Sequence, residues 1–249
     1  MRNAFKEALE SYQEALALFN LLPESPERNL RELELRQSVV ETLYLTNGYS
    51  ASETIDATES AAALAEKSGN LKQLVNWLLR RGLIALTTGD FPGAGAALDR
   101  ALELALREGS PTNLASVYTL QLPTRYWRGD LAGAEEHFTA GLKFFDDLGY
   151  WQLLGGAVTA FGYASWVAWT LGRADVARER EIQMMAAASP SNLYAMTVSA
   201  HLAAHLRAYM REYEQAEALA ASALSLSEKH QFPYIAALSR CALGRVRAQ

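Results

Sequence analysis

The sequence predicts an all-α fold, a right-handed α-solenoid of about twelve helices stacked as antiparallel pairs. Three observations predict it: a short phrase recurs about every forty residues, apolar residues recur at spacings of three and four, and strand-like alternation is absent. Helix pairs that cannot bury their apolar faces alone stack on their neighbours. We therefore expect residues 1–249 to form a single helical-repeat domain.

The recurring phrase begins with a glycine that ends one helix, as in TGDFPGAGAAL (88–98) and RGDLAGAEEHF (128–138). Glycine can adopt the left-handed conformation that terminates a helix without steric cost. An alanine five residues later lets the next helix approach its partner closely. The series comprises Gly48, Gly89, Gly129 and Gly172, spaced by 41, 40 and 43 residues, then Arg211 39 residues later, with alanines Ala94, Ala134, Ala177 and Ala216.

Turn and capping residues place the elements in order. Ser25 is the expected N-cap of the second helix, with Pro26 in its first position. Ser50 and Glu53 have the spacing of a capping box before the third helix. The predicted helices span 2–21, 26–46, 51–67, 70–88, 91–108, 111–128, 131–148, 151–171, 174–188, 191–210, 213–230 and 232–249.

These helices pair into repeats over 26–67, 70–108, 111–148, 151–188 and 191–230, with partial repeats at both ends. Helix 131–148 shows the apolar stripe most clearly, at Leu131, Ala134, Phe138, Leu142, Phe145 and Leu148. The chain begins inside an apolar-striped helix that includes Phe5 and ends in a helix without a partner, so we expect it to be a fragment of a longer protein. Uncapped ends of this kind also favour self-association into a homo-oligomer.

Composition excludes several function classes. The net charge of −5, with scattered basic residues, gives no patch for nucleic acid. No apolar run is long enough to span a bilayer, and the first residues lack the apolar core of a signal peptide. The single cysteine, Cys241, suits a reducing compartment. We expect a cytoplasmic protein without membrane or nucleic-acid partners, and without a cofactor because no phosphate-binding loop is present.

The turn phrase of glycine, an acidic or polar residue, an apolar residue, and alanine at plus five closely resembles that of tetratricopeptide (TPR) repeats. Gly82 and Gly244 lie where that repeat favours a small residue in its inner helix. The period of 39–43 residues exceeds the usual 34. The resemblance implies TPR-like repeats with lengthened helices, and HEAT-type repeats are the structural alternative.

A narrower resemblance covers the N-terminal third. LPESPER (22–28), RELEL (31–35) and GY (48–49) are similar to the helical region that follows the cyclase and ATPase domains of large bacterial regulators. This resemblance implies a non-catalytic sensor or scaffold in signal transduction, attached to an adenylate or guanylate cyclase or an ATPase. No catalytic residue of those domains can be carried over, because their motifs are absent.

The resemblance to TPR repeats implies that certain inner-helix positions line a groove for a protein or peptide segment, or for a small effector. Aromatic residues are effective anchors in such grooves. Trp166 and Trp169, three residues apart, suit either this groove or helix–helix core. The candidate groove residues are Trp166, Trp169, His201, His205, Tyr126, Thr119, Arg125 and Asn76.

Two further chemistries remain open. His201 and His205, at i and i+4, could offer two imidazoles to a metal in a metal-dependent enzyme, although no third ligand can be named. The alternative is that both imidazoles line the groove without a metal and are available for hydrogen bonds. Arg125 and Arg128, in RYWR (125–128), could hold a carboxylate or phosphate, or could simply pack at a helix end.

Overall fold

The computed structural model describes residues 2–19, 21–146, 150, 156–189 and 191–249, which form helices and turns without a β-strand. The predicted all-α fold class is confirmed. Leu148, the first residues of the helix expected over 151–171 and the side chain of Phe5 lie outside the described residues. The chain divides into two compact units, Met1–Val117 and Tyr118–Gln249.

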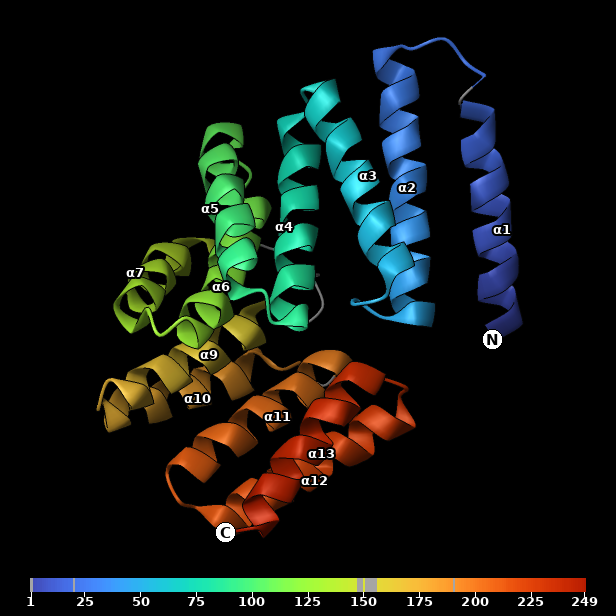
Figure 1. Ribbon diagram of the computed structural model, residues 1–249. Helices are drawn as coiled ribbons and strands as arrows, with labels where there is room; N and C mark the ends of the chain where they lie inside the picture. The colour runs from blue at the N-terminus through green and yellow to red at the C-terminus, as the bar shows by residue number, and fades with distance from the viewer. Residues whose placement is uncertain (1, 20, 147–149, 151–155, 190) are drawn as a thin grey trace. The chain divides into compact units, whose positions relative to one another are not determined.

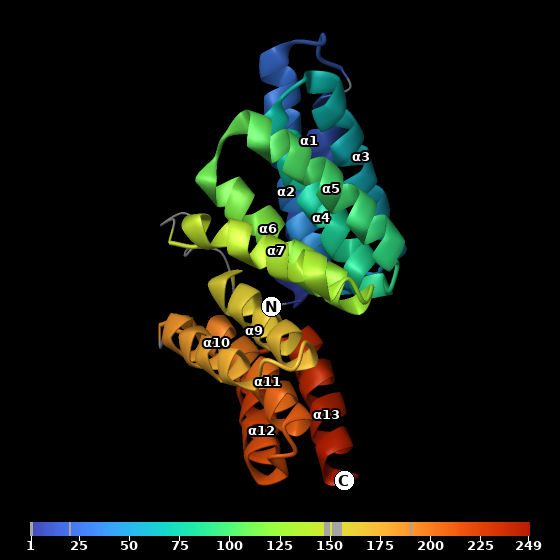
Figure 2. The same cartoon turned by 90° about the vertical axis from the view of Figure 1, so that its left-hand side faces the viewer.

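In the first unit, the helices between residues 2 and 108 pack in series, each against the next (Figures 1 and 2). Its core surrounds the indole of Trp77, which is 1% exposed and packs with Leu33 and Val40 of the second helix. Each helix begins and ends within two residues of its predicted bounds. The helices are α1 (Arg2–Phe19), α2 (Pro26–Asn47), α3 (Ser52–Ser68), α4 (Leu71–Thr88) and α5 (Phe91–Glu108), followed by the start of α6 (Pro111–Trp127).

The second unit contains the end of α6 and the remaining helices (Figure 1). Here α11 contacts α9 and α13, while α10 and α12 form hairpins with α9 and α11. The helices α9, α11 and α13 therefore make one layer. The elements are α7 (Leu131–Gly141), the 3₁₀ turn η1 (Leu142–Phe144), α9 (Gly156–Thr170), α10 (Ala174–Ala187), α11 (Leu193–Tyr209), α12 (Tyr213–Lys229) and α13 (Pro233–Arg247).

The turn residues of the later repeats adopt the predicted left-handed conformation, whereas Gly48, with φ 86° and ψ 174°, does not. Gly89, Gly129 and Gly172 have φ values of 84°, 76° and 77°. Arg211, which stands in the glycine position of its repeat, has φ 63°. A residue with a Cβ is strained in this region, so the turn geometry persists here at some cost.

The aspartate of each Gly-Asp pair also has a structural role that was not predicted from the sequence. The carboxylate of Asp90 accepts a 2.9 Å hydrogen bond from the backbone N–H of Gly93, and Asp130 accepts a 3.0 Å bond from Gly133. Both aspartates are N-caps of the following helix. A Cβ at Gly93 would lie only 2.0 Å from the Asp90 carboxylate, so the second glycine of the phrase leaves room for the cap.

Of two predictions about helix N-termini, one is confirmed and the other is wrong. Ser25 caps α2 as expected, accepting a 3.1 Å hydrogen bond from the N–H of Arg28. The capping box of Ser50 and Glu53 is wrong, because α3 begins after Ala51, which has no capping side chain.

The helix expected over 131–148 is also shorter than predicted. It ends at Gly141 and continues as the 3₁₀ turn. The ring of Phe145 packs so closely over Gly141 that a Cβ there would lie 2.6 Å from it. Leu142 is consequently 42% exposed rather than part of the buried stripe. Among the described helices, none combines the length and apolar character needed to cross a bilayer.

Candidate functional site

Aromatic and imidazole rings gather on the layer of the second unit made by α9, α11 and α13. On α11, His201, His205 and Tyr209 are spaced by four residues, so they lie on one face of the helix. The rings of α9 and the end of α6 meet this face. The group, called here the aromatic–imidazole cluster, comprises Tyr126, Tyr163, Trp166, His201, His205 and Tyr209.

Trp166 lies at the centre of the cluster. Its ring centroid is 4.8 Å from that of Tyr163, 5.0 Å from that of His205 and 5.7 Å from that of Tyr126. The structure therefore brings together four of the predicted groove residues, Tyr126, Trp166, His201 and His205. It adds Tyr163 and Tyr209, which sequence reasoning missed. Their spacing, three residues before Trp166 and four after His205, was the available signal.

Burial separates the cluster into an inner and an outer part. Trp166 is 2% exposed and His201 is 6% exposed, so both belong to the core of the unit. The other four rings are half-buried. Burial of Trp166 agrees with the core alternative for this residue, because α9 is covered by both α10 and α11. Trp169 is half-buried and packs on the same core.

Burial shifts the pKa values of four groups in the cluster, His201, His205, Tyr126 and Tyr163, toward their neutral forms. Burial lowers the pKa of His201 to about 4, with a smaller contribution from the positive charge of Arg245. Burial, together with His201 and Arg245, lowers the pKa of His205 to about 3. Burial raises the pKa of Tyr163 to about 12 and that of Tyr126 above its usual value. At neutral pH the cluster thus offers uncharged hydrogen-bonding groups.

Arg245 of α13 supplies the positive charge beside these neutral groups. Its Nη2 lies 3.0 Å from Nδ1 of His205, and its guanidinium carbon is 5.3 Å from the centroid of the Tyr209 ring. The hydroxyl of Tyr126 donates to that of Tyr209 at 3.4 Å. The buried Nδ1 of His201 has no hydrogen-bond partner.

The other predicted groove residues lie elsewhere. Thr119 is 5% exposed and hydrogen-bonds to the hydroxyl of Tyr150. Nη1 of Arg125 donates to Asp130 at 2.5 Å and so braces the turn after α6. Asn76 is half-buried on α4, in the first unit. These three residues do not join the aromatic–imidazole cluster.

The two histidines are poorly placed for the metal site considered from their spacing. Their ring centroids are 4.7 Å apart, but the described residues include no group of three His, Cys, Asp or Glu side chains that could hold a metal. The guanidinium of Arg245 also points at His205 Nδ1, where its charge would repel a bound cation. The geometry therefore favours an imidazole pair that acts through hydrogen bonds.

Comparison with known proteins gives structural neighbours only: no family model and no curated protein matches the sequence. BtubC (BKLC) from P. vanneervenii is similar, with a TM-score of 0.65 and 13% identity over 92% of both chains. A Rap protein complexed with Competence and Sporulation Factor has a TM-score of 0.61 and 17% identity, over 99% of this chain and 71% of that chain.

A third similar structure is PH0952 from Pyrococcus horikoshii, a signal transduction ATPase with numerous domains (STAND) and a tetratricopeptide repeat sensor. The TM-score is 0.51 at 11% identity, and the match covers 95% of this chain and 43% of that chain. The fold is a TPR-like helical repeat. At these identities the likeness concerns the fold alone. The narrower resemblance to cyclase–ATPase regulators stays a prediction.

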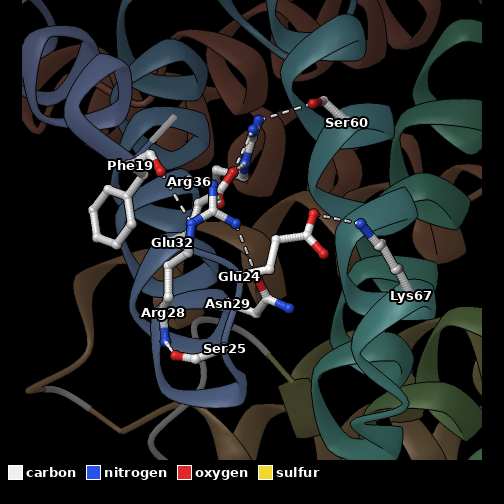
Figure 3. Close-up of polar contacts among 9 residues, drawn as sticks. All are labelled: Phe19, Glu24, Ser25, Arg28, Asn29, Glu32, Arg36, Ser60 and Lys67. Carbon is white, nitrogen blue, oxygen red and sulfur yellow. Dashed lines mark hydrogen bonds and ion pairs between the residues drawn. The ribbon is translucent and has the colours of Figure 1, made fainter. Parts of the chain in front are cut away.

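A second feature of the TPR-like fold lies in the first unit. A surface pocket of about 540 Å³ opens between the α1–α2 loop, the start of α2 and the α3–α4 turn. Figure 3 shows the polar contacts beside it: Lys67 Nζ pairs with Glu24 at 2.7 Å across the pocket, and Arg28 Nε donates to the backbone oxygen of Phe19 at 3.0 Å. Arg28 and Arg36 both pair with the buried Glu32.

Most of these polar groups are paired, although Oε2 of Glu32, 3.2 Å from Nη2 of Arg28, accepts no hydrogen bond. Arg36 also donates to Ser60 on α3 at 2.8 Å, so the ion pairs tie α1, α2 and α3 together. Glu24 and Lys67, which line the pocket, are therefore paired with each other, and Arg28 and Arg36 are engaged in contacts within the fold. The aromatic–imidazole cluster, with its half-buried rings beside the exposed Arg245, is the better candidate for recognition.

Proposed function

We propose that this chain is a non-catalytic recognition module whose aromatic–imidazole cluster binds a peptide segment of a partner protein. The observation that carries the proposal is the convergence of four half-buried rings, Tyr126, Tyr163, His205 and Tyr209, around a buried tryptophan. Half-buried tyrosines offer large contact area with little rotamer entropy to lose, and their hydroxyls give direction to a ligand.

The helical layer gives these rings a fixed setting. They come from α6, α9 and α11. The helices α9 and α11 pack together and are also joined by the 3.0 Å bond from the Trp166 indole to the backbone oxygen of Leu202. A preorganised surface loses less entropy on binding than a mobile one. A small effector that fills the same surface is the alternative ligand.

The chain also acts, in this proposal, as the sensor or scaffold of a larger cytoplasmic signalling protein, regulating attached cyclase or ATPase domains. Two similarities support it: the sequence motifs within residues 22–35, and the structural similarity to PH0952, a protein with a tetratricopeptide repeat sensor. The Rap protein, similar in fold, was crystallised with Competence and Sporulation Factor, which supports ligand recognition by such a fold.

The test is selection of random peptides on phage against the 249-residue chain, followed by fluorescence polarisation with the selected peptides. Tyr209→Ala is expected to weaken binding about tenfold or more, since a central tyrosine of a recognition surface contributes strongly. The matched control is Tyr213→Ala, a half-buried tyrosine on α12 outside the cluster. Equal binding by wild type and Tyr209→Ala would contradict the proposal.

A further inference from the structure

The charge of Arg245 is left without a carboxylate partner. On the same helix, Arg240 pairs with Glu228 at 2.6 Å and Arg247 pairs with Glu217 at 2.7 Å. Among the carboxylates that the structure describes, none pairs with Arg245. Its guanidinium instead lies over the Tyr209 ring and against the neutral imidazole of His205. A guanidinium has five N–H donors, and these contacts occupy few of them.

The imidazoles beside Arg245 add unused hydrogen-bonding capacity. His201 is more than nine-tenths buried, and its Nδ1 has no partner. Its ring lies 4.7 Å from that of His205, so the two imidazoles and the guanidinium form a continuous polar strip. Buried polar atoms are nearly always paired in native proteins, and an unpaired one is a feature that a ligand can satisfy.

Resting on the proposed function, we propose that Arg245, His205 and His201 form an anion subsite that receives a carboxylate of the bound peptide. A carboxylate can accept two parallel N–H bonds from the guanidinium. Neutral imidazoles can donate to the same group from their N–H tautomer. The half-buried tyrosines then hold the apolar part of the peptide next to the carboxylate.

A carboxylate fits this subsite better than the other charged groups. The six residues of the cluster carry no acidic group and Arg245 beside them is cationic, so the site disfavours a cationic ligand. One guanidinium beside two neutral imidazoles matches a single negative charge. A phosphorylated side chain would bring nearly two negative charges to one cation.

Three tripeptides test the subsite by NMR of ¹⁵N-histidine-labelled chain. Acetyl-Tyr-Leu-Asp-amide carries a side-chain carboxylate, acetyl-Tyr-Leu-Ala with a free C-terminus carries a terminal one, and acetyl-Tyr-Leu-Asn-amide carries none. At least one of the two acids is expected to shift the His201 and His205 resonances with a Kd about tenfold lower than that of the neutral peptide. Which acid binds better identifies the source of the carboxylate.

The variant pair Arg245→Gln and Arg240→Gln isolates the charge, because both arginines are exposed on α13. Arg245→Gln is expected to remove the preference for the acids, and Arg240→Gln to keep it. Equal binding of the three peptides, no binding of any, or a preference that survives Arg245→Gln would overturn the subsite. Peptide binding by the aromatic–imidazole cluster would still stand if phage-selected peptides bind in a Tyr209-dependent way, so the two failures are distinguishable.

Discussion

The indole Nε1 of Trp166 on α9 donates a 3.0 Å hydrogen bond to the backbone oxygen of Leu202 on α11. This bond joins two successive inner helices through a side chain that is 2% exposed. Trp166→Phe keeps an aromatic ring but removes the donor and part of the packed volume. We expect a loss of about 1–3 kcal/mol in the free energy of unfolding, measured by urea denaturation. Trp169→Phe, at a half-buried ring on the same helix, should cost less.

The two inner-helix glycines Gly162 and Gly244 should respond oppositely to alanine. A Cβ at Gly162 would lie 2.4 Å from Cδ1 of Leu202 and 3.0 Å from Sδ of Met184, whereas a Cβ at Gly244 would meet nothing within 4 Å. Gly162→Ala should therefore destabilise the chain by about 1–3 kcal/mol. Gly244→Ala should stabilise it by about 0.5–1 kcal/mol through helix propensity. Thermal and urea unfolding of both variants check the signs.

Arg211 occupies a left-handed turn position with φ 63°. Arg211→Gly should raise the free energy of unfolding by about 0.5–1 kcal/mol, because glycine adopts this conformation without a Cβ clash. The converse substitution, Gly129→Ala at φ 76°, should lower it by about 1 kcal/mol. If Arg211→Gly were destabilising, contacts of the arginine side chain would stabilise the turn by more than its left-handed backbone conformation costs.

The imidazole pair makes stability depend on pH. Burial lowers the pKa of His201 to about 4 and of His205 to about 3, while in the unfolded chain both titrate near 6.5. As the pH falls from 7 to 5, both imidazoles become protonated in the unfolded chain but stay neutral in the native chain. The free energy of unfolding therefore falls. The loss should be on the order of 1 kcal/mol for each imidazole.

Urea unfolding at pH 7 and pH 5 measures this loss. The variant His201→Gln/His205→Gln should show a smaller decrease than the wild type across the same interval. Carboxylates contribute chiefly at lower pH, so the interval reports mainly on the histidines. An unchanged decrease in the double variant would mean that other groups cause it.

The helices could be predicted from the sequence because their ends carry residues with strong local preferences. Gly89, Gly129 and Pro26 mark turns or helix starts through backbone geometry alone. The end of α7 could not be predicted, because its apolar stripe continues through Leu142 while the ring of Phe145 folds back over Gly141. That closure is a tertiary contact, which periodicity does not report.

The candidate site could be predicted only in part, for a similar reason. The spacing of His201 and His205 places both imidazoles on one face of a helix. Periodicity did not show that α9 is covered on two sides and that Trp166 is therefore buried. Arg245 comes from a helix forty residues beyond His205, and only the fold brings the two within 3.0 Å. The resemblance to cyclase–ATPase regulators remains a prediction.

The aspartate caps make certain amino-acid changes dependent on one another. Because the carboxylate of Asp130 fills the space where a Cβ of residue 133 would lie, alanine at Gly133 is unfavourable while the aspartate remains. Once Asp130 is replaced by a smaller residue, the same alanine becomes favourable in the helix. The two positions are therefore epistatic: the effect of alanine at position 133 on stability changes sign with the residue at position 130.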